Sequence, residues 1–559
     1  MKKLVGFALL GLVLSACQKE TYDVIIRNGT VYDGTGSPGI TAEVGINGDT
    51  IAFLGDLSKA IGKKEIDAEG LAVAPGFINM LSHAETSLLF DGNSESDIRQ
   101  GVTLEVFGEI SMGPMSAPMK QEEEAMMKKD PDWEYKIEWT TLGEYLETLE
   151  RKGISPNVAS FVGASTIRVH ELGYANRAPS PEELERMKTL VKQAMEEGAM
   201  GVTTALIYAP SNYAKTEELI ELSKVAAEYG GMYIAHIRSE GNAIMEAIEE
   251  TILIARKANI AAEIYHLKLS GKDNWNKLDT VINRLRQAEK EGLRITADMY
   301  TYTAGATGLD AAMPPWLQEG GIKEWIKRMK DPKIRKKALE EMRTPTNQWE
   351  NLMLLTGDFD KVLLLGFTND SLRKNFAGKT LKQVAEIYGK SPEETAMDLV
   401  ITDGTRVGTA YFLMTEENVK RQIALPYVSF GSDAESSTAA GNFLKQPTHP
   451  RAYGNFARLL GKYVREEKVI PLEEAVRKLT SLPADNLKVK KRGRLKAGNF
   501  ADLAIFDPEK IQDHATFENP HQYSTGMVHV FVNGVQVLEN GSHTGARPGR
   551  VVRGPGWRK

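Results

Sequence analysis

The sequence predicts an α/β protein: a TIM (β/α)8 barrel, with a small β-sandwich domain formed by both chain ends and an insertion before the last barrel strand. Three observations predict this fold. Short apolar runs alternate with helical patterns through the middle of the 559-residue chain, at roughly the 30-residue spacing of a βα unit. Alternating strand patterns with glycine-rich turns occupy both ends. A long charged stretch interrupts the repeat before its last strand.

Residues 1–16 have the pattern of a lipoprotein signal peptide. Met1-Lys2-Lys3 is a short positive region, and Leu4 to Leu14 is apolar but too short to span a bilayer. The following Leu-Ser-Ala-Cys resembles the bacterial lipobox, and Cys17 is the only cysteine of the chain. We expect an exported lipoprotein, anchored by lipid on Cys17 and facing the periplasm, with Gln18 favouring the outer membrane. An ordinary signal peptide with an incidental cysteine is the alternative.

Residues 17–70 and 481–559 are expected to build the small β domain together. Strand patterns bounded by turns occur at 23–33 and 42–52, and the same alternating pattern recurs at 501–507 and 528–534.

Residues 71–480 are expected to form the barrel, with residues of about 308–425 inserted over its mouth. The candidate strands are Leu71–Ile78, Thr103–Phe107, Asn157–Val162, Ala199–Ala205, Met232–His236, Ala262–His266, Arg294–Tyr300 and Pro426–Phe430. Eight such strands with intervening helices favour a closed barrel. The net charge of -6 shows no basic stripe, so a nucleic-acid partner is not expected.

Two of these strands end in histidine and a third is followed by aspartate. His236 and His266 end successive apolar runs, and Asp433 comes three residues after Phe430. Active sites of barrel enzymes are built at the carboxyl ends of several strands, so these side chains are expected to converge. For a single histidine, a hydrogen-bonded place in the core is the alternative interpretation.

Two histidines and a carboxylate are sufficient to hold a catalytic zinc ion with an open position for water. Glu109, just after the second strand, is the best third ligand, and Asp433 is the best general base. For Glu109, a surface loop position is the alternative.

The chain resembles the N-acyl-D-amino acid deacylase (D-aminoacylase) family of the amidohydrolase superfamily from about residue 23 to the end. The motifs that carry the resemblance are Ala74–Asn79, Glu197–Thr204, His236–Gly241, His266–Trp275, Asp298–Gly305, Gly431–Asp433, His449–Arg451, Leu495–Leu503 and Val532–Gly534. The resemblance implies a metal-dependent hydrolase of N-acyl amino acids, and the preference for D-stereochemistry comes from it alone.

Two departures from the family pattern concern the metal site. The first strand of the family ends in His-x-His, whereas this chain has Leu81-Ser82-His83. The family's usual cysteine ligand is replaced by Glu109. We therefore expect one zinc ion per chain, with another divalent metal possible because oxygen has replaced sulfur, and His83 as a further candidate ligand.

The resemblance also implies how the substrate carboxylate is held. The family positions that bind it correspond to Lys268, Tyr300 and Arg451. A guanidinium supplies a bidentate fork, a lysine a point charge and a tyrosine a hydroxyl donor. For a lone lysine or arginine, a solvated surface charge is the alternative.

The expected reaction is hydrolysis of the amide bond of a small N-acyl-(D-)amino acid, with water activated by the metal and Asp433. Two alternatives remain open: a cyclic-amide or dipeptide hydrolase of the same superfamily, and a catalytically inactive ligand-binding lipoprotein, which Leu81 would favour.

Overall fold

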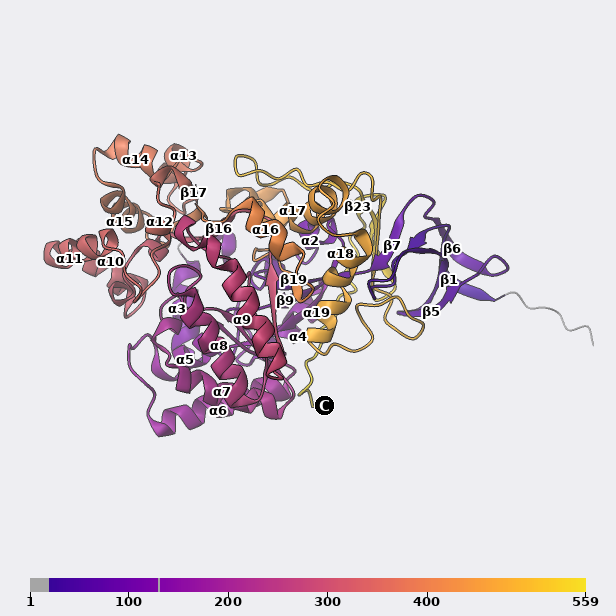
Figure 1. The fold of residues 1–559 in the computed structure, drawn as a ribbon, viewed down its shortest axis with the longest axis horizontal. Helices are drawn as coiled ribbons and strands as arrows, with labels where there is room; N and C mark the ends of the chain where they lie inside the picture. Colours follow the sequence, from indigo (N-terminus) through magenta and orange to yellow (C-terminus); the bar gives the residue numbers. More distant parts are fainter. Residues whose placement is uncertain (1–19, 129–130, 559) are drawn as a thin grey trace, which may run out of the picture.

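The computed structural model describes residues 20–128 and 131–558 (Figure 1). The predicted signal peptide and Cys17 lie outside these residues. Within the described ranges, no helix has both the length and the apolar character needed to cross a membrane.

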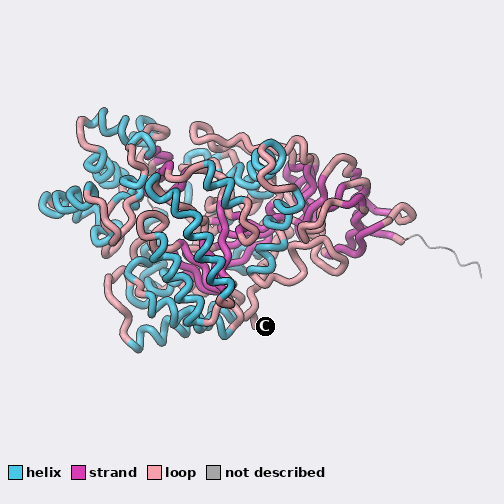
Figure 2. Tube along the Cα trace, viewed as in Figure 1, coloured by secondary structure: helices cyan, strands magenta, loops and turns pink. Residues whose placement is uncertain are grey.

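The core of the molecule is a set of parallel strands covered by helices, which confirms the α/β class (Figure 2). One parallel sheet has the order β10-β9-β8 and a second has the order β11-β12-β13-β14-β15-β19. These strands are β8 (Phe77–Ser82), β9 (Val102–Phe107), β10 (Asn157–Ser160), β11 (Val162–Gly163), β12 (Gly201–Ala205), β13 (Met232–His236), β14 (Ala261–Ile264), β15 (Ile295–Met299) and β19 (Val428–Phe430).

Hydrogen bonds connect the two parallel sheets at both junctions. β10 and β11 are separated by Phe161 alone, and the Met200 N–H donates to Ser160 O at 2.9 Å. At the other junction Ser82 forms a parallel bridge with Ala434, and the Asp433 N–H donates to Leu81 O at 2.9 Å. The carboxyl ends of β8 and β19 therefore lie side by side.

The predicted first strand, Leu71–Ile78, is divided between two sheets. β7 (Ala72–Pro75) pairs with the C-terminal β20, whereas β8 begins at Phe77 and pairs with β9. The switch occurs at Gly76, where an added Cβ would lie 2.1 Å from Thr103 Oγ1. Only glycine permits this close approach, and the apolar run alone could not reveal it.

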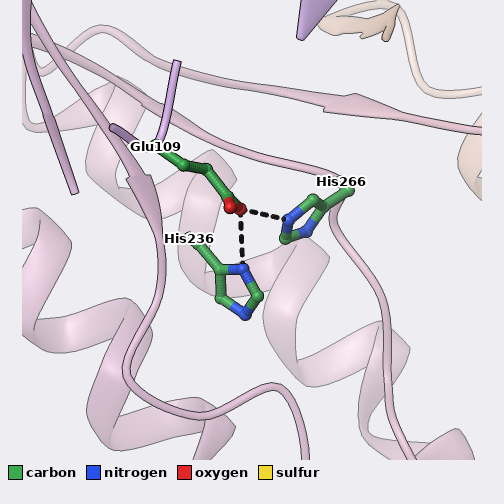
Figure 3. A group of neighbouring side chains, drawn as sticks. All are labelled: Glu109, His236 and His266. Atoms are coloured by element: carbon green, nitrogen blue, oxygen red, sulfur yellow. Dashed lines mark hydrogen bonds and ion pairs between the residues drawn. The ribbon is translucent and has the colours of Figure 1, made fainter. Parts of the chain in front are cut away.

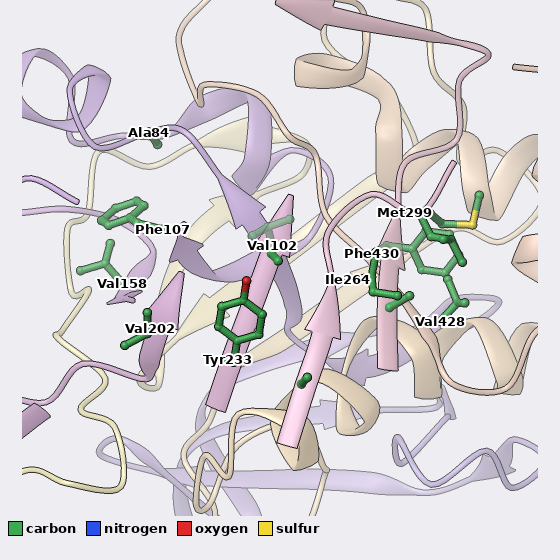
Figure 4. Close-up of a cluster of buried hydrophobic side chains, with 14 of the residues drawn as sticks. Ala84, Val102, Phe107, Val158, Val202, Tyr233, Ile264, Met299, Val428 and Phe430 are labelled. Atoms are coloured by element: carbon green, nitrogen blue, oxygen red, sulfur yellow. The ribbon is translucent and has the colours of Figure 1, made fainter. Parts of the chain in front are cut away.

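Residues along β13 alternate between two apolar clusters. In β13, Tyr233 and Ala235 pack in the large cluster that includes helix side chains, whereas Met232 and Ile234 pack in a second, inner cluster. Figure 4 shows side chains of the first cluster on successive strands. His236 continues the inner series at 232 and 234, so the alternation places it on the inner face.

Amphipathic helices complete the large cluster. In α6 the Ser180 side chain accepts the Glu183 N–H and Glu183 accepts the Ser180 N–H, as the capping-box pattern predicts. The helices outside the insertion are α1 (Ser87–Phe90), α2 (Glu95–Ile98), α3 (Ala117–Met127), α4 (Leu142–Lys152), α5 (Ala164–Leu172), α6 (Pro181–Glu196), α7 (Thr216–Glu228), α8 (Ile244–Ala258), α9 (Leu278–Lys290), α16 (Glu416–Ile423), α17 (Arg451–Arg458), α18 (Leu472–Leu479) and α19 (Ser481–Asn486).

Two further sheets are built from the ends of the chain, one from N-terminal strands and one from strands of both ends. One has the order β5-β4-β1-β6 and the other β23-β22-β21-β20-β7-β2-β3. An apolar cluster unites N-terminal side chains such as Ile26 and Ile46 with C-terminal ones such as Leu503 and Phe531. The remaining bounds are β1 (Thr21–Arg27), β2 (Thr30–Val31), β3 (Ile40–Thr41), β4 (Glu43–Asn47), β5 (Thr50–Gly55), β6 (Ile61–Asp67), β20 (Leu503–Phe506), β21 (Met527–Val532), β22 (Val535–Glu539) and β23 (Ser542–His543).

The segment before β19 has an apolar core of its own. Figure 1 shows its helices at the end of the molecule opposite β1 and β6. α16 follows this core, and its Val419 and Ile423 pack instead in the large cluster. The elements of the segment are β16 (Ala304–Gly308), α10 (Ile322–Lys330), α11 (Pro332–Arg343), α12 (Leu352–Leu355), β17 (Val362–Gly366), α13 (Asp370–Phe376), α14 (Leu381–Tyr388), α15 (Pro392–Asp403) and β18 (Gly408–Phe412).

Candidate active site

Three of the predicted ligands meet at the carboxyl ends of their strands (Figure 3). Glu109 Oε1 lies 2.8 Å from His236 Nδ1 and 3.0 Å from His266 Nε2. Donor atoms of a tetrahedral zinc site with bonds of about 2.0–2.1 Å lie roughly 3.3 Å apart. The Glu109 oxygen therefore needs to move only a few tenths of an ångström away from each nitrogen to hold such an ion with them.

Positive backbone φ angles occur at three of the predicted site residues. They are 64° at Glu109, 34° at His266 and 49° at Asp433. Left-handed conformations are unfavourable for residues other than glycine and cluster at functional sites, where the surrounding structure enforces them. They interrupt the strand alternation at the points where β9, β14 and β19 have just ended.

A second group of potential ligands shares Glu109 with the first. His83 Nε2 lies 3.1 Å from Asp433 Oδ1 and 3.9 Å from Glu109 Oε2. Asp433 is already engaged on its other oxygen, because Arg451 Nη1 lies 2.7 Å from Oδ2. The sequence did not indicate that the predicted base and the predicted carboxylate-binding arginine form an ion pair.

Leu81 is fully buried and belongs to the inner apolar cluster. A methyl group added at Gly108 would lie 3.2 Å from Leu81 Cδ1 and 1.9 Å from Tyr265 Oη. Packed hydrocarbon and an aromatic ring thus surround the position at which the family pattern has the first histidine of His-x-His.

The electrostatics keep both carboxylates ionised. Burial opposes ionisation of Glu109, but its interactions with His236 and His266 hold the pKa of this carboxyl well below its usual range. Burial likewise opposes ionisation of Asp433, but Arg451 and His266 lower its pKa to about 2. Burial lowers the pKa of His83, yet the hydrogen bond to Asp433 and the charge of Glu109 raise it to about 9.

The three residues predicted to bind a substrate carboxylate line the same cavity of about 510 Å³. The Arg451 guanidinium lies 4.6 Å from the centre of the Tyr300 ring, and Lys268 Nζ lies 5.4 Å from it. Tyr300 Oη is buried and has no hydrogen-bond partner among the described residues, so it is free to donate to a ligand.

One residue at the centre of this arrangement had no predicted role. Glu240 is buried, and its Oε1 lies 2.7 Å from Lys268 Nζ and 3.0 Å from His266 Nδ1. A signal was present in the sequence, because this carboxylate follows His236 by four residues in the turn after the strand.

Comparison with known proteins identifies the family. A family model described as the amidohydrolase family matches residues 64–538. The chain belongs to the amidohydrolase family. This amidohydrolase is 33% identical to the D-aminoacylase of Alcaligenes xylosoxydans xylosoxydans over 544 residues, which are 96% of this chain and 99% of that protein. The predicted resemblance to the D-aminoacylase branch is confirmed.

Comparison with solved structures supports the same family assignment. A D-aminoacylase studied for its binuclear metal centre, with activation by one metal and attenuation by a second, superimposes on the amidohydrolase with a TM-score of 0.77 at 31% identity, covering 95% of this chain and 100% of that one. The N-acyl-D-glutamate deacylase from Bordetella bronchiseptica, solved with zinc and a phosphonate mimic of the tetrahedral intermediate, has a TM-score of 0.79 at 28% identity, covering 96% and 100%.

Proposed function

We propose that the protein hydrolyses the amide bond of N-acyl-D-amino acids. The observation that carries this proposal is the cavity that Glu109, His236 and His266 share with Lys268, Tyr300 and Arg451. One set of side chains suits a metal ion and the other suits an α-carboxylate. The relatives named as deacylases of D-amino acids, D-glutamate and D-aspartate support the D-configuration.

A zinc ion fits Glu109, His236 and His266, because imidazole nitrogen and carboxylate oxygen are normal zinc ligands. When bound, the ion would polarise the acyl carbonyl and acidify water. We infer one ion per chain at this position. Replacement of a thiolate by Glu109 also suits harder divalent ions, so manganese or cobalt could serve.

We propose that Asp433 moves the proton. Its carboxylate is ionised at neutral pH and faces the cavity. It accepts the proton of the attacking water and returns that proton to the nitrogen of the leaving amine. The ion pair with Arg451 and the contact with His83 fix the position of both carboxylate oxygens.

Arg451, Tyr300 and Lys268 bind the α-carboxylate of the substrate. A guanidinium carries five N–H donors, so Arg451 can keep its ion pair with Asp433 and still bind a carboxylate. This arrangement ties the position of the base to the position of the substrate, since one side chain contacts both.

The test is a panel of N-acetyl-D- and N-acetyl-L-amino acids, a dipeptide and a cyclic amide, assayed with zinc-loaded protein. We expect cleavage of D-substrates, and a fall of roughly 10- to 100-fold in kcat/KM when the α-carboxylate is replaced by an amide, because hydrogen bonds to charged groups contribute about 1.5–3 kcal/mol. Equal rates on the amide would contradict the deacylase assignment, and faster cleavage of the cyclic amide would favour that alternative.

We propose further that the parallel strands close into a (β/α)8 barrel spanning residues 71–480, interrupted by the insertion. The hydrogen bonds at the β10–β12 and β8–β19 junctions support closure. The shared apolar cluster of the chain ends supports a small β-sandwich of residues 17–70 and 481–559. Hydrogen exchange that protects the strands at both junctions as strongly as the central strands would agree with closure, whereas fast exchange at either junction would contradict it.

We propose that Cys17 is lipidated and anchors the protein to a membrane facing the periplasm. The pattern of residues 1–17 supports this. Labelling of expressing cells with a radioactive fatty acid should mark the wild type and leave Cys17→Ala unlabelled; equal labelling of the two would refute it.

A further inference from the structure

Glu240 contacts both halves of the active site. It lies four residues after His236, in the turn between β13 and α8, and only 4% of its surface is exposed. Its Oε1 is 3.0 Å from His266 Nδ1, 3.6 Å from His236 Nε2 and 2.7 Å from Lys268 Nζ. One carboxylate oxygen therefore faces two metal-ligand candidates and one substrate-binding candidate.

The two glutamates contact opposite nitrogens of the same imidazoles. Glu109 contacts Nδ1 of His236 and Nε2 of His266, whereas Glu240 faces the other nitrogen of each ring. A metal-bound imidazole usually donates its second N–H to a carboxylate or carbonyl, which fixes the tautomer and the ring orientation. Glu240 is the carboxylate that faces these second nitrogens. Lys268 Nζ, which is paired with Glu240, donates to His266 Nδ1 at 2.6 Å, so the carboxylate and the lysine together orient this ring.

Glu240 also holds Lys268. Within the described residues this is the one ion pair that Lys268 makes, and the lysine is 6% exposed. Removing the carboxylate would leave a buried ammonium 2.6 Å from His266 Nδ1 without its counter-charge.

The backbone of Glu240 is fixed from two sides. Its N–H donates to Glu350 Oε1 at 2.9 Å, and its carbonyl accepts the Ser270 N–H at 2.7 Å. Glu350 belongs to the insertion and lies half-buried against this turn, where it also accepts from the Ser239 hydroxyl. The insertion thus contributes to the placement of Glu240.

We propose that Glu240 is a positioning residue that couples the metal-binding histidines to the lysine that receives the substrate carboxylate. This inference rests on the proposed function for its substrate half, whereas its metal half is independent of which substrate is cleaved. Glu240 contacts neither the metal position nor the reacting atoms and acts through His266, His236 and Lys268.

The experiment compares wild type, Glu240→Gln and Glu263→Gln. Glu263 is an equally buried glutamate in β14 that hydrogen bonds to Thr296 and Asn486 and makes no contact with the site, so it controls for loss of a buried carboxylate. The dissociation constant for zinc is measured by competition with a chelator on folded protein, without substrate. Glu240→Gln should weaken zinc binding about 10- to 100-fold, and Glu263→Gln should leave it within about twofold of wild type.

The second arm measures KM for the fastest substrate of the panel in Glu240→Gln, in Lys268→Met and in the double variant. We expect each single change to raise KM and the two effects to be strongly non-additive, because both act through the lysine. Zinc binding by Glu240→Gln within twofold of wild type, or additive KM effects, would overturn the proposal. If wild type cleaves no member of the panel, the proposed function fails, while the zinc measurement still decides the role of Glu240 at the metal ligands.

Discussion

The two groups of potential ligands that share Glu109 differ in what surrounds them. His236 and His266 are almost fully buried, and each presents its second nitrogen to Glu240. His83 is more exposed, with 27% of its side chain accessible, and contacts Asp433, which is already paired with Arg451. Leu81, two residues before His83, packs in the inner apolar cluster. We proposed the first group as the metal site, whereas the second group is an ion-pair network around Asp433, the proposed base.

The largest effect should come from breaking the first group. His266→Ala removes one of the three proposed ligands. Loss of a residue that only hydrogen bonds to a metal ligand lowers metal affinity by up to roughly 100-fold, so loss of a ligand itself should lower zinc affinity by more than that, and hydrolysis should become undetectable. His529→Ala, a change at a buried histidine in β21, is the matched control and should keep both properties. Measurable turnover by His266→Ala at saturating zinc would contradict the distinction between the two groups, because hydrolysis would then not require the first group.

Removing the proposed base should separate catalysis from metal binding. Asp433→Asn should lower kcat by roughly 10²- to 10⁴-fold, with zinc affinity within about threefold of wild type, because Asp433 lies outside the first group. Asp502→Asn is the control, since Asp502 is also a buried aspartate paired with an arginine, Arg492. Full activity in Asp433→Asn would refute the assigned role.

Leu81 can be used to convert the second group into a metal site. Leu81→His restores the family's His-x-His spacing, and bound zinc should rise from about one to about two per chain at saturating metal. Leu81→Gln places a polar side chain there without a nitrogen ligand and should stay near one. A ratio of one in both variants would mean that packing, rather than the missing ligand, excludes the second ion.

The smallest effect concerns the stability of the metal-free protein. The pKa of His83 is raised from 6.5 to about 9 in the folded protein. Its contribution to the free energy of unfolding is therefore fully present below pH 6.5 and is lost as pH rises through 9. We expect this contribution, on the order of 1 kcal/mol after allowing for partial exposure, as the difference between wild type and His83→Asn in urea unfolding. A difference that grows between pH 6.5 and 9 would contradict the ion-pair account.

The sequence was sufficient to predict the residues that converge but not how they pair. Strand ends in a parallel arrangement meet at one edge, which is why His236, His266 and Asp433 could be placed together from local pattern alone. The Arg451–Asp433 ion pair depends on how the turn after β19 approaches the start of α17. The contact of Glu240 with Lys268 depends on two neighbouring turns. Such pairings are set by long-range packing, and no local periodicity encodes them.

The division of the predicted first strand has the same origin. Leu71 to Ile78 was predicted as one strand, yet Gly76 N–H donates to Asp502 O and Phe77 N–H donates to Gly101 O. Adjacent residues thus pair with different sheets, Gly76 with the C-terminal region next to β20 and Phe77 with the residue that precedes β9. Only the fold of the C-terminal region determines where the strand is divided.

The central claim is that one metal ion is held by Glu109, His236 and His266. The most direct test is a crystal structure of zinc-loaded protein with an anomalous difference map at the zinc edge. We predict one strong peak within about 2.0–2.2 Å of one oxygen of Glu109 and one nitrogen of each histidine. A strongest peak between His83 and Asp433, two peaks of equal height, or no peak at these residues would contradict the account.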